Sequence, residues 1–517
     1  MLIGELLTRA AKWYPDKTAA VFEEKRFTYR EFNDRANSLA NALLDLGVRK
    51  DERVALICHN SHYYAESVFA IAKIGAVSTN LNWRLSGREL ASLIEDSGAA
   101  IVLFSKRFEH LFASMREQAP STVRYIAIEG KIDDDMIDYE DLVMQYPSIE
   151  PHIEIDENDT VLQLYTSGTT GRPKGVMLTH RNMLSNAVNT IIEMQITREM
   201  NILGFLPIFH IAIFMLINVV YVGATATFVH GFDVDLVLSV MEREKLNTVA
   251  FTPIIFKFLL EHPTLDKYDL SPLKTIIYTT APMPVDLLKR SMAKFKCDYL
   301  QLFGMTETSP VLGLLIPEDH VLEGPEYKVR RLASCGRPIA NVDVKIVDSA
   351  GKECPPEVVG EIIGRGDNVM KGYHKLPDAT AKAIRDGWYY TGDMGYMDEY
   401  GYLYIADRKT DMIISGGENI YPLEVEGAIN MMPGVADVAV IGVPDDAWGE
   451  SVKAVVVSMP GSELTEEMVV EHCKKTIASY KKPKSVDFVD MLPRNALGKI
   501  QKAELRAKYW EGRERKV

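Results

Sequence analysis

The residues best suited to chemistry gather in the stretch 165–175, which reads Tyr-Thr-Ser-Gly-Thr-Thr-Gly-Arg-Pro-Lys-Gly. Its glycines lack Cβ atoms, so backbone N–H groups can approach an anion closely, and its hydroxyl side chains add further hydrogen-bond donors. Arg172 and Lys174 supply positive charge. Such a loop suits a polyphosphate. The residues that we predict to bind phosphate are Thr166, Ser167, Gly168, Thr169, Thr170, Gly171 and Lys174.

This stretch differs from the common nucleotide-binding loop. That loop requires Gly-Lys followed by Ser or Thr, and it leads directly into a helix. Here Lys174 is followed by Gly175, and Pro173 interrupts the run. The alternative to phosphate binding is a flexible surface turn that binds nothing.

The stretch 165–175 resembles a signature of the acyl-adenylate-forming enzymes, which include acyl-CoA synthetases, nonribosomal peptide adenylation domains and firefly luciferase. The resemblance extends from about Thr28 to Leu505, with five signatures in the order of the family. Because all eleven residues of the stretch match the signature, we favour phosphate binding over the surface turn. The resemblance implies that ATP and Mg²⁺ are used to activate a carboxylic acid.

A second stretch, 302–307 (Leu-Phe-Gly-Met-Thr-Glu), is similar to the family signature Tyr-Gly-x-Thr-Glu. The resemblance assigns Glu307, together with Thr166, to Mg²⁺, which takes few protein carboxylates and completes its shell with phosphate and water. Thr306 would donate to the α-phosphate or to the acyl oxygen. Phe303 replaces the usual tyrosine, so stacking on adenine survives while a phenolic hydrogen bond is lost. Taken alone, Thr-Glu is a common surface dipeptide.

Residues 389–393 (Tyr-Tyr-Thr-Gly-Asp) match a further family signature. The two oxygens of an Asp carboxylate can accept from both hydroxyls of a ribose, and the resemblance places Arg408 beside Asp393 at that diol. The alternative is an Asp that caps a turn. In relatives the adenine lies against residues that correspond here to Ala281, Pro282, Gln301, Leu302, Phe303 and Gly304.

Lys499 lies in the stretch 493–500 (Pro-Arg-Asn-Ala-Leu-Gly-Lys-Ile), which resembles the C-terminal signature that carries the catalytic lysine of the family. A carboxylate that attacks the α-phosphorus of ATP approaches an anionic centre, so the reaction needs positive charge as the bond forms. Lys499 would bridge the nucleophile and the α-phosphate. The alternative is a solvated lysine in a basic tail. Acetylation of Lys499 by a lysine acetyltransferase would remove its charge, and we expect it to silence adenylation.

The second half-reaction, with coenzyme A, should use a different loop. Gly416 and Gly417 follow a short apolar segment and offer a surface without side chains for the narrow pantetheine arm. In the family, a small domain swings after adenylation and presents this loop. Thr410 stands where relatives carry Asp or Lys at the hinge, and a small hydroxyl residue can still absorb the backbone change. Basic residues that could hold CoA phosphates, or form only a solvated face, are Lys481, Lys482, Lys484 and Arg494.

The acyl side is the least specified. Phe209-His210 matches the aromatic-His motif of acyl-CoA synthetases, where it lies beside the carboxylate. Peptide adenylation domains carry an Asp there to hold a substrate amine, so its absence speaks against an amino acid substrate. The alternative, which we favour less, is that His210 is a packed, satisfied histidine. Apolar residues that could form an acyl pocket, or ordinary core, are Phe209, Ile213, Phe214, Ile254, Ile255, Tyr278, Leu302 and Val311.

The elements that must position these groups alternate between helix and strand. Residues 53–58, 100–104 and 160–164 read as buried strands, and capping signals at Thr28 and Ser86 open helices. This βαβ rhythm predicts parallel sheets covered by helices on both faces.

We therefore predict an α/β fold with two domains. Residues 1–408 would form a large AMP-binding domain of doubly wound sheets. Within it, short strands broken by Gly and Pro indicate a small β-rich subdomain at about 337–408. Residues 409–517 would form a mobile α+β domain that carries the catalytic lysine.

Composition limits the class of protein. The 517 residues are 47% hydrophobic and 25% charged, and the net charge of −14 argues against nucleic acid as the main partner. Five cysteines without a Cys-x-x-Cys pair fit reduced cytosolic thiols, and no cleavable signal is visible.

The apolar run 209–229 contains His210 and Asn218, so we expect a buried helix followed by a strand, not a membrane span. The expected location is the cytoplasm. The oligomeric state is not readable, and a homodimer is one option.

These residues together predict an acyl-CoA synthetase that adenylates an apolar carboxylic acid (fatty, aromatic or alicyclic) and then forms the CoA thioester. One rival is an acyl-AMP ligase that loads a carrier protein, and another is a luciferase-like oxygenase. A third is a noncatalytic nucleotide- or lipid-binding homologue. The retention of Glu307, Asp393, Arg408 and Lys499 argues against this third rival.

Overall fold

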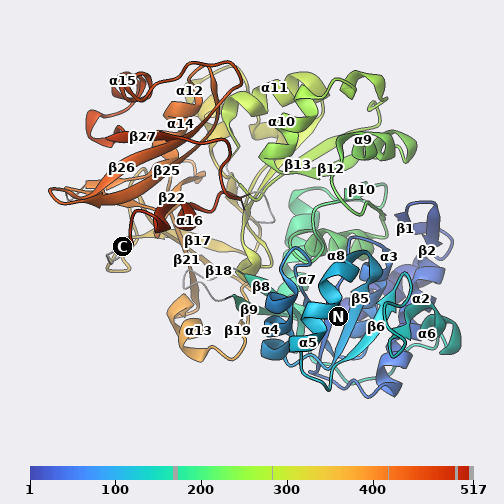
Figure 1. The fold of residues 1–517 in the computed structure, drawn as a ribbon. Coiled ribbons are helices and arrows are strands. Elements are labelled where there is room, and N and C mark those ends of the chain that lie inside the picture. Colours follow the sequence, from blue (N-terminus) through green and yellow to red (C-terminus); the bar gives the residue numbers. More distant parts are fainter. Residues whose placement is uncertain (167–172, 282, 417, 495–498, 512–517) are drawn as a thin grey trace.

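The structure is a computed structural model that describes residues 1–166, 173–281, 283–416, 418–494 and 499–511. Two large sheets with their helices come first along the chain. A small antiparallel sheet follows, and a C-terminal α/β unit completes the fold (Figure 1). This is the mixed α/β architecture that the alternation of helix and strand predicts.

The first large sheet has eight strands, and most of its central neighbours run parallel, as the βαβ rhythm predicts. At one side β8 pairs with β9 antiparallel, so the two strands that flank residues 167–172 form a hairpin. The strands are, in spatial order, β19 (Gly372–Tyr373), β9 (Lys174–Thr179), β8 (Thr160–Thr166), β4 (Val77–Asn80), β3 (Arg53–Ile57), β5 (Ile101–Ser105), β6 (Arg124–Ile128) and β7 (Ile137–Asp138).

The second large sheet has nine strands, of which the central ones are also parallel. Its strands are, in spatial order, β16 (Arg337–Pro338), β15 (Val311–Leu315), β14 (Asp298–Gly304), β13 (Thr275–Tyr278), β12 (Thr248–Phe251), β10 (Asn201–Gly204), β11 (Thr225–Phe228), β1 (Thr18–Phe22) and β2 (Lys25–Thr28). The antiparallel β14–β15 pair turns the chain back at one side of the sheet.

Helices cover both faces of each large sheet. A central layer shares one apolar core with both sheets, and it consists of α1 (Ile3–Trp13), α2 (Tyr29–Asp45), α3 (His62–Lys73), α7 (His180–Glu193) and α8 (Ala212–Val222). The outer face of the eight-stranded sheet packs on α4 (Gly87–Ser97) and α5 (Glu109–Gln118). The outer face of the nine-stranded sheet packs on α9 (Val234–Arg243), α10 (Pro253–Glu261) and α11 (Val285–Phe295). Shorter helices are α6 (Tyr139–Gln145), α12 (Glu326–Val329) and α13 (Pro377–Ala383).

Two helix starts follow directly from the sequence. The Thr28 side chain accepts from Glu31 N at 3.2 Å, and the Glu31 carboxylate accepts from Thr28 N at 2.8 Å. Ser86 and Glu89 make the same pair of bonds at 3.3 and 2.8 Å. Each pair satisfies backbone N–H groups that a helix start leaves without an internal partner. Both predicted caps are confirmed.

The apolar run 209–229 forms helix α8 followed by strand β11, as expected. Gly223 ends the helix in the left-handed conformation, with φ 75°, which an amino acid with a Cβ adopts only at a cost. In the part of the chain that the structure describes, no helix has both the length and the apolar character needed to cross a bilayer.

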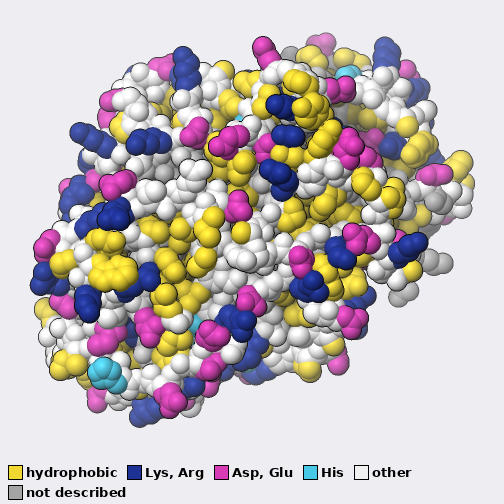
Figure 2. Space-filling view, turned by 180° about the vertical axis from the view of Figure 1, so that it is seen from behind, with side chains coloured by type: hydrophobic (Ala, Val, Ile, Leu, Met, Phe, Trp, Pro, Cys, Tyr) yellow, Lys and Arg dark blue, Asp and Glu magenta, His cyan; other side chains and the backbone are white. Residues whose placement is uncertain are grey.

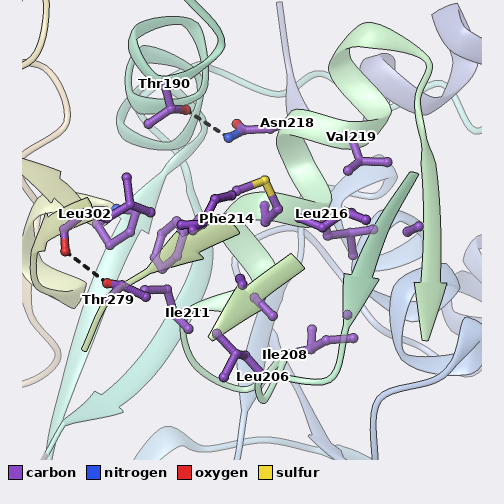
Figure 3. A pocket seen from close by; sticks show the side chains of 18 of the residues that line it. Thr190, Leu206, Ile208, Ile211, Phe214, Leu216, Asn218, Val219, Thr279 and Leu302 are labelled. Carbon is purple, nitrogen blue, oxygen red and sulfur yellow. Dashed lines mark hydrogen bonds between the residues drawn. The ribbon is translucent and has the colours of Figure 1, made fainter. Parts of the chain in front are cut away.

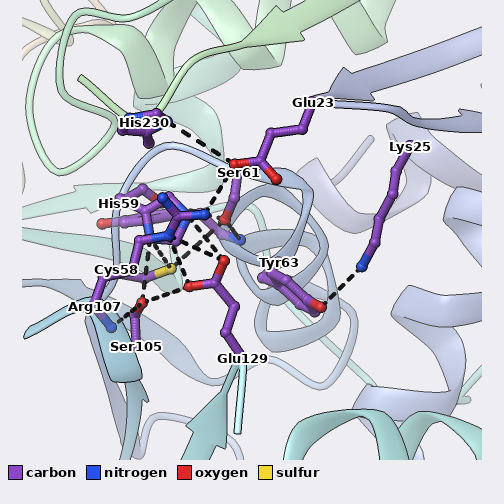
Figure 4. A network of polar contacts seen from close by, with 11 residues as sticks. Glu23, Lys25, Cys58, His59, Ser61, Tyr63, Ser105, Arg107, Glu129 and His230 are labelled. Atoms are coloured by element: carbon purple, nitrogen blue, oxygen red, sulfur yellow. Dashed lines mark hydrogen bonds and ion pairs between the residues drawn. The ribbon is translucent and has the colours of Figure 1, made fainter. Parts of the chain in front are cut away.

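A polar network joins the two large sheets (Figure 4). Arg107 follows β5 in one sheet and contacts Glu129 at 3.1 Å and Glu23, at the β1–β2 turn of the other sheet, at 2.9 Å. Ser105 donates to Glu129 at 3.1 Å and contacts the His59 ring at 3.2 Å. Burial and the charge of Arg107 lower the pKa of His59 to about 3, so its ring is neutral in this network.

A small antiparallel sheet precedes the C-terminal unit, and its strands are β17 (Asp343–Val347), β18 (Gly360–Arg365), β20 (Ile384–Arg385), β21 (Trp388–Met397) and β22 (Leu403–Arg408). The C-terminal unit has the strands β23 (Ile413–Ser415), β24 (Glu418–Ile420), β25 (Val435–Asp445), β26 (Gly449–Ser458) and β27 (Ser485–Phe488). Its helices are α14 (Pro422–Asn430), α15 (Glu466–Thr476) and α16 (Lys502–Ala507), and it has an apolar core of its own. On the face of the molecule in Figure 2, acidic and basic side chains are interspersed.

Candidate active site

Thr166 and Glu307, which the sequence assigns to Mg²⁺, lie side by side. Thr166 ends β8, and Glu307 lies in a short 3-10 turn, Thr306–Thr308, that follows β14. Thr166 Oγ1 donates to Glu307 Oε1 at 3.5 Å, and the hydroxyl of Tyr373 donates to the same oxygen at 3.1 Å. The backbone N–H of Met370 donates to the Glu307 carbonyl at 2.8 Å, which fixes the turn.

The surroundings of Glu307 favour a cation. The residue is only 9% exposed, and burial raises the pKa of its carboxyl group, while the positive charges of Arg408 and Lys174 oppose that shift. The Lys174 ammonium lies 4.9 Å from the centre of the Tyr373 ring. A buried carboxylate beside one hydroxyl group fits Mg²⁺, which takes most of its ligands from phosphate and water. Among the described residues no cluster of three or more His, Cys, Asp or Glu side chains could hold a metal ion by itself.

Asp393 and Arg408, the predicted ribose pair, face each other across two neighbouring strands. β21 and β22 pair these residues directly, and Arg408 Nε lies 3.4 Å from Asp393 Oδ1. Asp393 is 8% exposed; burial raises the pKa of its carboxyl group, and the charge of Arg408 opposes this. The Asp393 N–H donates to Thr391 Oγ1 at 3.0 Å, which anchors the backbone at this point.

The segment that carries Lys499 is tied to the C-terminal unit on both sides. The N–H of Gln501 donates to the Pro493 carbonyl at 2.8 Å, and residues 495–498 lie outside the described residues. Ion pairs then fix both ends of the segment. These pairs are Arg494–Asp437 at 2.5 Å, Lys502–Glu426 at 2.8 Å and Arg506–Asp411 at 2.5 Å.

Charged groups that the N-terminal sheets position act on Lys499. Burial lowers the pKa of its ammonium to about 8; the charge of Arg408 acts in the same direction, and Asp393 and Glu307 oppose it. Burial and the charge of Lys499 lower the pKa of His210 to about 4, so this imidazole is neutral near pH 7. The amine of the C-terminal unit therefore lies within electrostatic reach of the predicted metal, ribose and carboxylate positions.

The residues predicted to line an adenine slot lie where β13 and β14 end. Tyr278 and Gln301 are register partners in these parallel strands, and Thr279 Oγ1 donates to the Leu302 carbonyl at 3.1 Å. A Cβ atom on Gly304 would lie 1.8 Å from the Pro310 carbonyl oxygen, so only glycine fits there. Phe303, which precedes Gly304, and Ala281, two residues after Thr279, are both partly buried. The predicted site residues that lie outside the described residues are Ser167, Gly168, Thr169, Thr170, Gly171, Pro282 and Gly417.

Gly416 stands apart from this group. Its N–H donates to the Trp448 carbonyl at 2.8 Å, and a Cβ atom at Gly416 would lie 2.2 Å from the Trp448 ring. No contact between Gly416 and the groups around Glu307 is found in the described part of the chain. The basic residues considered for CoA phosphates pair within the C-terminal unit: Lys481 with Glu424 at 2.7 Å, Lys484 with Asp445 at 2.9 Å and Arg494 with Asp437 at 2.5 Å.

An apolar pocket opens beside the adenine slot, between the nine-stranded sheet and helices α7 and α8 (Figure 3). Its cavity volume is about 50 Å³, so the pocket is narrow in this structure. Ile208 and Ile211, which flank His210 in the sequence, line it. The predicted pocket residues that line it are Phe214, Leu302 and Val311.

The other predicted pocket residues belong to the packed interior. Ile213 is buried in the central core, and Ile255 and Tyr278 are buried in the core under α9, α10 and α11. Ile254 packs, partly buried, against that second core. Phe209 packs edge-on against Trp83 with 6.2 Å between ring centres. These apolar residues fill core positions. We predicted them as pocket residues because the sequence alone does not separate a core face from a pocket wall.

Sequence reasoning missed three polar residues at the site. Tyr373, which donates to Glu307, comes from a two-residue strand with no motif around it. Thr190 and Asn218 lie on helices α7 and α8 and line the apolar pocket. The only sequence signal for Asn218 was a polar amide inside an apolar run, which we used solely as an argument against a membrane span.

Comparison with known proteins assigns the two parts of the chain. Residues 7–374 match the AMP-binding enzyme family, and residues 424–499 match the C-terminal domain of AMP-binding enzymes. A feruloyl-CoA synthase of Amycolatopsis sp. is 38% identical over 509 residues, which cover 98% of this chain and 99% of that protein.

Two further relatives cover almost the whole chain. The long-chain-fatty-acid–CoA ligase FadD13 of Mycobacterium tuberculosis is 36% identical over 517 residues, covering 98% of each protein. Among solved structures, ATP-bound MatB from Rhodopseudomonas palustris is 32% identical, covers 98% of this chain and 99% of its own, and superimposes with a TM-score of 0.88.

Proposed function

The chain belongs to the AMP-binding enzyme family, and from this premise we propose which residues carry out its reaction and which kind of acid it takes. It is an AMP-forming acid–CoA ligase that uses ATP, Mg²⁺ and coenzyme A. In the first half-reaction an oxygen of the acid bonds to the α-phosphorus of ATP, and pyrophosphate leaves. In the second, the CoA sulfur bonds to the acyl carbon, and AMP leaves.

Adenylation needs positive charge where two anions meet. We assign this charge to the ammonium of Lys499, which would lie between the attacking carboxylate and the α-phosphate. Asp393 would accept from the ribose hydroxyls beside Arg408, and Thr306 would donate to the α-phosphate or the acyl oxygen. The neutral imidazole of His210 would lie beside the substrate carboxylate. Because it carries no positive charge, it would not form an ion pair with the carboxylate that attacks phosphorus. Mg²⁺, when bound at Glu307 and Thr166, neutralises charge on the phosphates.

One observation carries this assignment. Lys499 is buried, and it lies close enough to Arg408, Asp393 and Glu307, which come from different strands and turns of the N-terminal part, for their charges to act on its pKa. A lysine in a solvated tail would feel none of them. The ion pairs on both sides of Lys499 hold its segment in this position.

The second half-reaction would use a different arrangement of two domains. We propose that residues 1–408 and 409–517 rotate relative to each other about Thr410, which withdraws Lys499 and brings the Gly416–Gly417 loop to the nucleotide. The two family matches support this division, because one ends at residue 374 and the other begins at 424. After this motion Lys484 or Arg494 would meet CoA phosphates by exchanging its pair with Asp445 or Asp437 for a phosphate.

Substitution of Lys499 tests the assignment. Lys499→Ala should lower acid-dependent release of pyrophosphate about 10²- to 10³-fold, the usual cost of losing one group that stabilises transition-state charge. Thioester formation from supplied acyl-AMP and CoA should continue, because that step uses the other arrangement. Lys508→Ala, at an exposed lysine outside the site, is the matched control and should leave both halves unchanged. Equal loss of both half-reactions in Lys499→Ala would contradict the two-arrangement mechanism.

Acetylation of Lys499 would act through the same charge. A lysine acetyltransferase that modified Nζ would replace the ammonium by a neutral amide. We expect the acetylated protein to lose pyrophosphate release and to regain it after deacetylation. Full adenylation activity of protein acetylated at Lys499 would contradict this.

We propose that the acid is apolar, because the walls of the pocket beside the adenine slot are largely aliphatic and aromatic. The names of the relatives span an aromatic acid and long fatty acids. A panel of carboxylic acids assayed for CoA-dependent production of AMP would identify the class. Product that forms only with a carrier protein, and not with free CoA, would instead favour an acyl-AMP ligase.

We place the enzyme in the cytoplasm. All five cysteines are free thiols, and Cys58, Cys335 and Cys473 are buried. Buried unpaired thiols fit a reducing compartment better than an oxidising one. Localisation of a tagged full-length chain in its host would test this.

A further inference from the structure

One polar side chain in the apolar pocket lacks a partner for its oxygen. The pocket is lined by four polar side chains, Asn186, Thr190, Asn218 and Thr279, in otherwise apolar walls (Figure 3). Asn218 is 2% exposed, and its Oδ1 has no hydrogen-bond partner in the structure. A buried acceptor without a donor costs free energy, so such a group calls for an explanation.

The orientation of the Asn218 amide is fixed by Thr190. Thr190 Oγ1 donates its single proton to a backbone carbonyl of its own helix, at 2.9 Å to Asn186 O or 3.1 Å to Ala187 O. With that proton directed to its own helix, Thr190 Oγ1 accepts from Asn218, and Asn218 Nδ2 donates to it at 2.9 Å. With the amide nitrogen committed to Thr190, the oxygen is the atom left for a ligand.

The other side-chain oxygens in the pocket are occupied. Asn186 Oδ1 accepts from the Val311 N–H at 3.2 Å, and Thr279 Oγ1 donates to the Leu302 carbonyl at 3.1 Å. Both of these bonds tie the pocket wall to β14 and β15. Among the side-chain oxygens of the lining residues, all of which are described, Asn218 Oδ1 is the one with no partner.

Asn218 lies far from the reacting end of the acid. It follows His210 by eight residues, mostly along α8, and a helix rises by about 1.5 Å per residue, so their backbones are about 12 Å apart. Thr279 and Leu302, by contrast, adjoin the adenine slot. Figure 3 shows the Asn218–Thr190 pair and the Thr279–Leu302 pair on different sides of the drawn side chains.

We propose that the acid carries a hydroxyl group at the end remote from its carboxyl group, and that this hydroxyl donates to Asn218 Oδ1. The inference rests on the proposed function and names the substrate class of the same pocket. Apolar walls bind the body of the acid, Lys499 and His210 meet its carboxylate, and Asn218 selects the far end. Asn218 is thus a specificity-determining residue, and Thr190 positions it.

Matched pairs of acids test this selection. Each pair replaces the terminal hydroxyl by a methyl group of similar size: para-hydroxycinnamic against para-methylcinnamic acid, and ω-hydroxydecanoic against undecanoic acid. A site built around a hydrogen bond rejects an analogue that cannot make it. In at least one pair, kcat/KM for acyl-CoA formation by the wild-type chain should favour the hydroxy acid about tenfold or more.

Three variants connect the preference to this amide. Asn218→Leu keeps the size of the side chain but removes the acceptor, and it should erase or reverse the preference. Thr190→Val releases the amide from its partner and should reduce the preference. Met215→Leu, a change of similar volume at another lining residue, is the matched control and should keep the preference. Direct binding of non-reactive acyl-adenylate analogues of both acids gives the same comparison without turnover.

The outcomes separate this inference from the proposed function. Equal use of both members of both pairs by the wild-type chain would overturn the inference while leaving the ligase activity intact. A preference that persists in Asn218→Leu would also overturn it, because another group would then read the hydroxyl. Should no acid of a broad panel yield AMP and a CoA thioester, the proposed function would fall and this inference with it. Retained use of undecanoic acid by Asn218→Leu would show that the variant folds.

Discussion

The protonation of Lys499 gives a pH profile that can be worked out in advance. Only the ammonium form can neutralise the charge that builds between the carboxylate and the α-phosphate. The pKa of Lys499 is about 8 in the free protein, because burial and the nearby charge of Arg408 disfavour the charged form. The group is therefore active below pH 8, and activity is lost as pH rises through that value.

The size of the effect follows from the titration curve. With this pKa, about 90% of the chains carry an ammonium at pH 7 and about 10% at pH 9. The ratio kcat/KM for ATP reports the groups of the free enzyme. At acid concentrations well below saturation, and with saturating Mg²⁺, it should fall to half near pH 8 and then about tenfold for each further unit of pH.

Two variants isolate the group. Lys499→Arg carries a guanidinium that stays charged throughout this range, so its lower activity should show no decline between pH 7 and pH 9. Arg408→Met removes the positive neighbour while burial is kept, so the decline should move to higher pH. Release of pyrophosphate is the measurement. The same alkaline decline in wild type and in Lys499→Arg would refute the assignment, because the titrating group would then lie elsewhere.

Two further predictions concern residues that shape the site. Gly304→Ala places a Cβ against the Pro310 carbonyl oxygen, and we expect it to destabilise the chain by about 3 kcal/mol and to reduce adenylation, because the turn that carries Thr306 must shift. Gly427→Ala is the matched control: its added Cβ meets no atom within 4 Å on an exposed helix position, so the melting temperature should hold or rise. Glu307→Gln keeps the shape of a buried carboxylate and removes its charge. It should raise the Mg²⁺ concentration needed for half-maximal adenylation at least about tenfold with little loss of stability, and an unchanged Mg²⁺ dependence would show that Glu307 is not a ligand.

Much of the local structure could be predicted from the sequence. The caps at Thr28 and Ser86 form as expected because each depends on two hydrogen bonds between residues three apart. The helix and strand in 209–229 were also predictable, since Gly223 separates an apolar helical segment from a β-branched one. The motifs likewise identified the family, because each consists of consecutive residues and can be recognised without knowledge of the fold.

What the sequence determined by itself, then, is the set of local elements, the order of the motifs and the family that they indicate. Only the tertiary structure brings the charges of Glu307, Asp393 and Arg408 close to Lys499, and only it places Asn218 in the wall of an apolar pocket and Ile213 in the core. The physical reason is the range of the interactions. Helix caps and loop signatures depend on neighbours along the chain, whereas the convergence of distant charges depends on the order of strands in the sheets. An apolar side chain gains by leaving water in either place, so burial alone does not separate a binding surface from the interior.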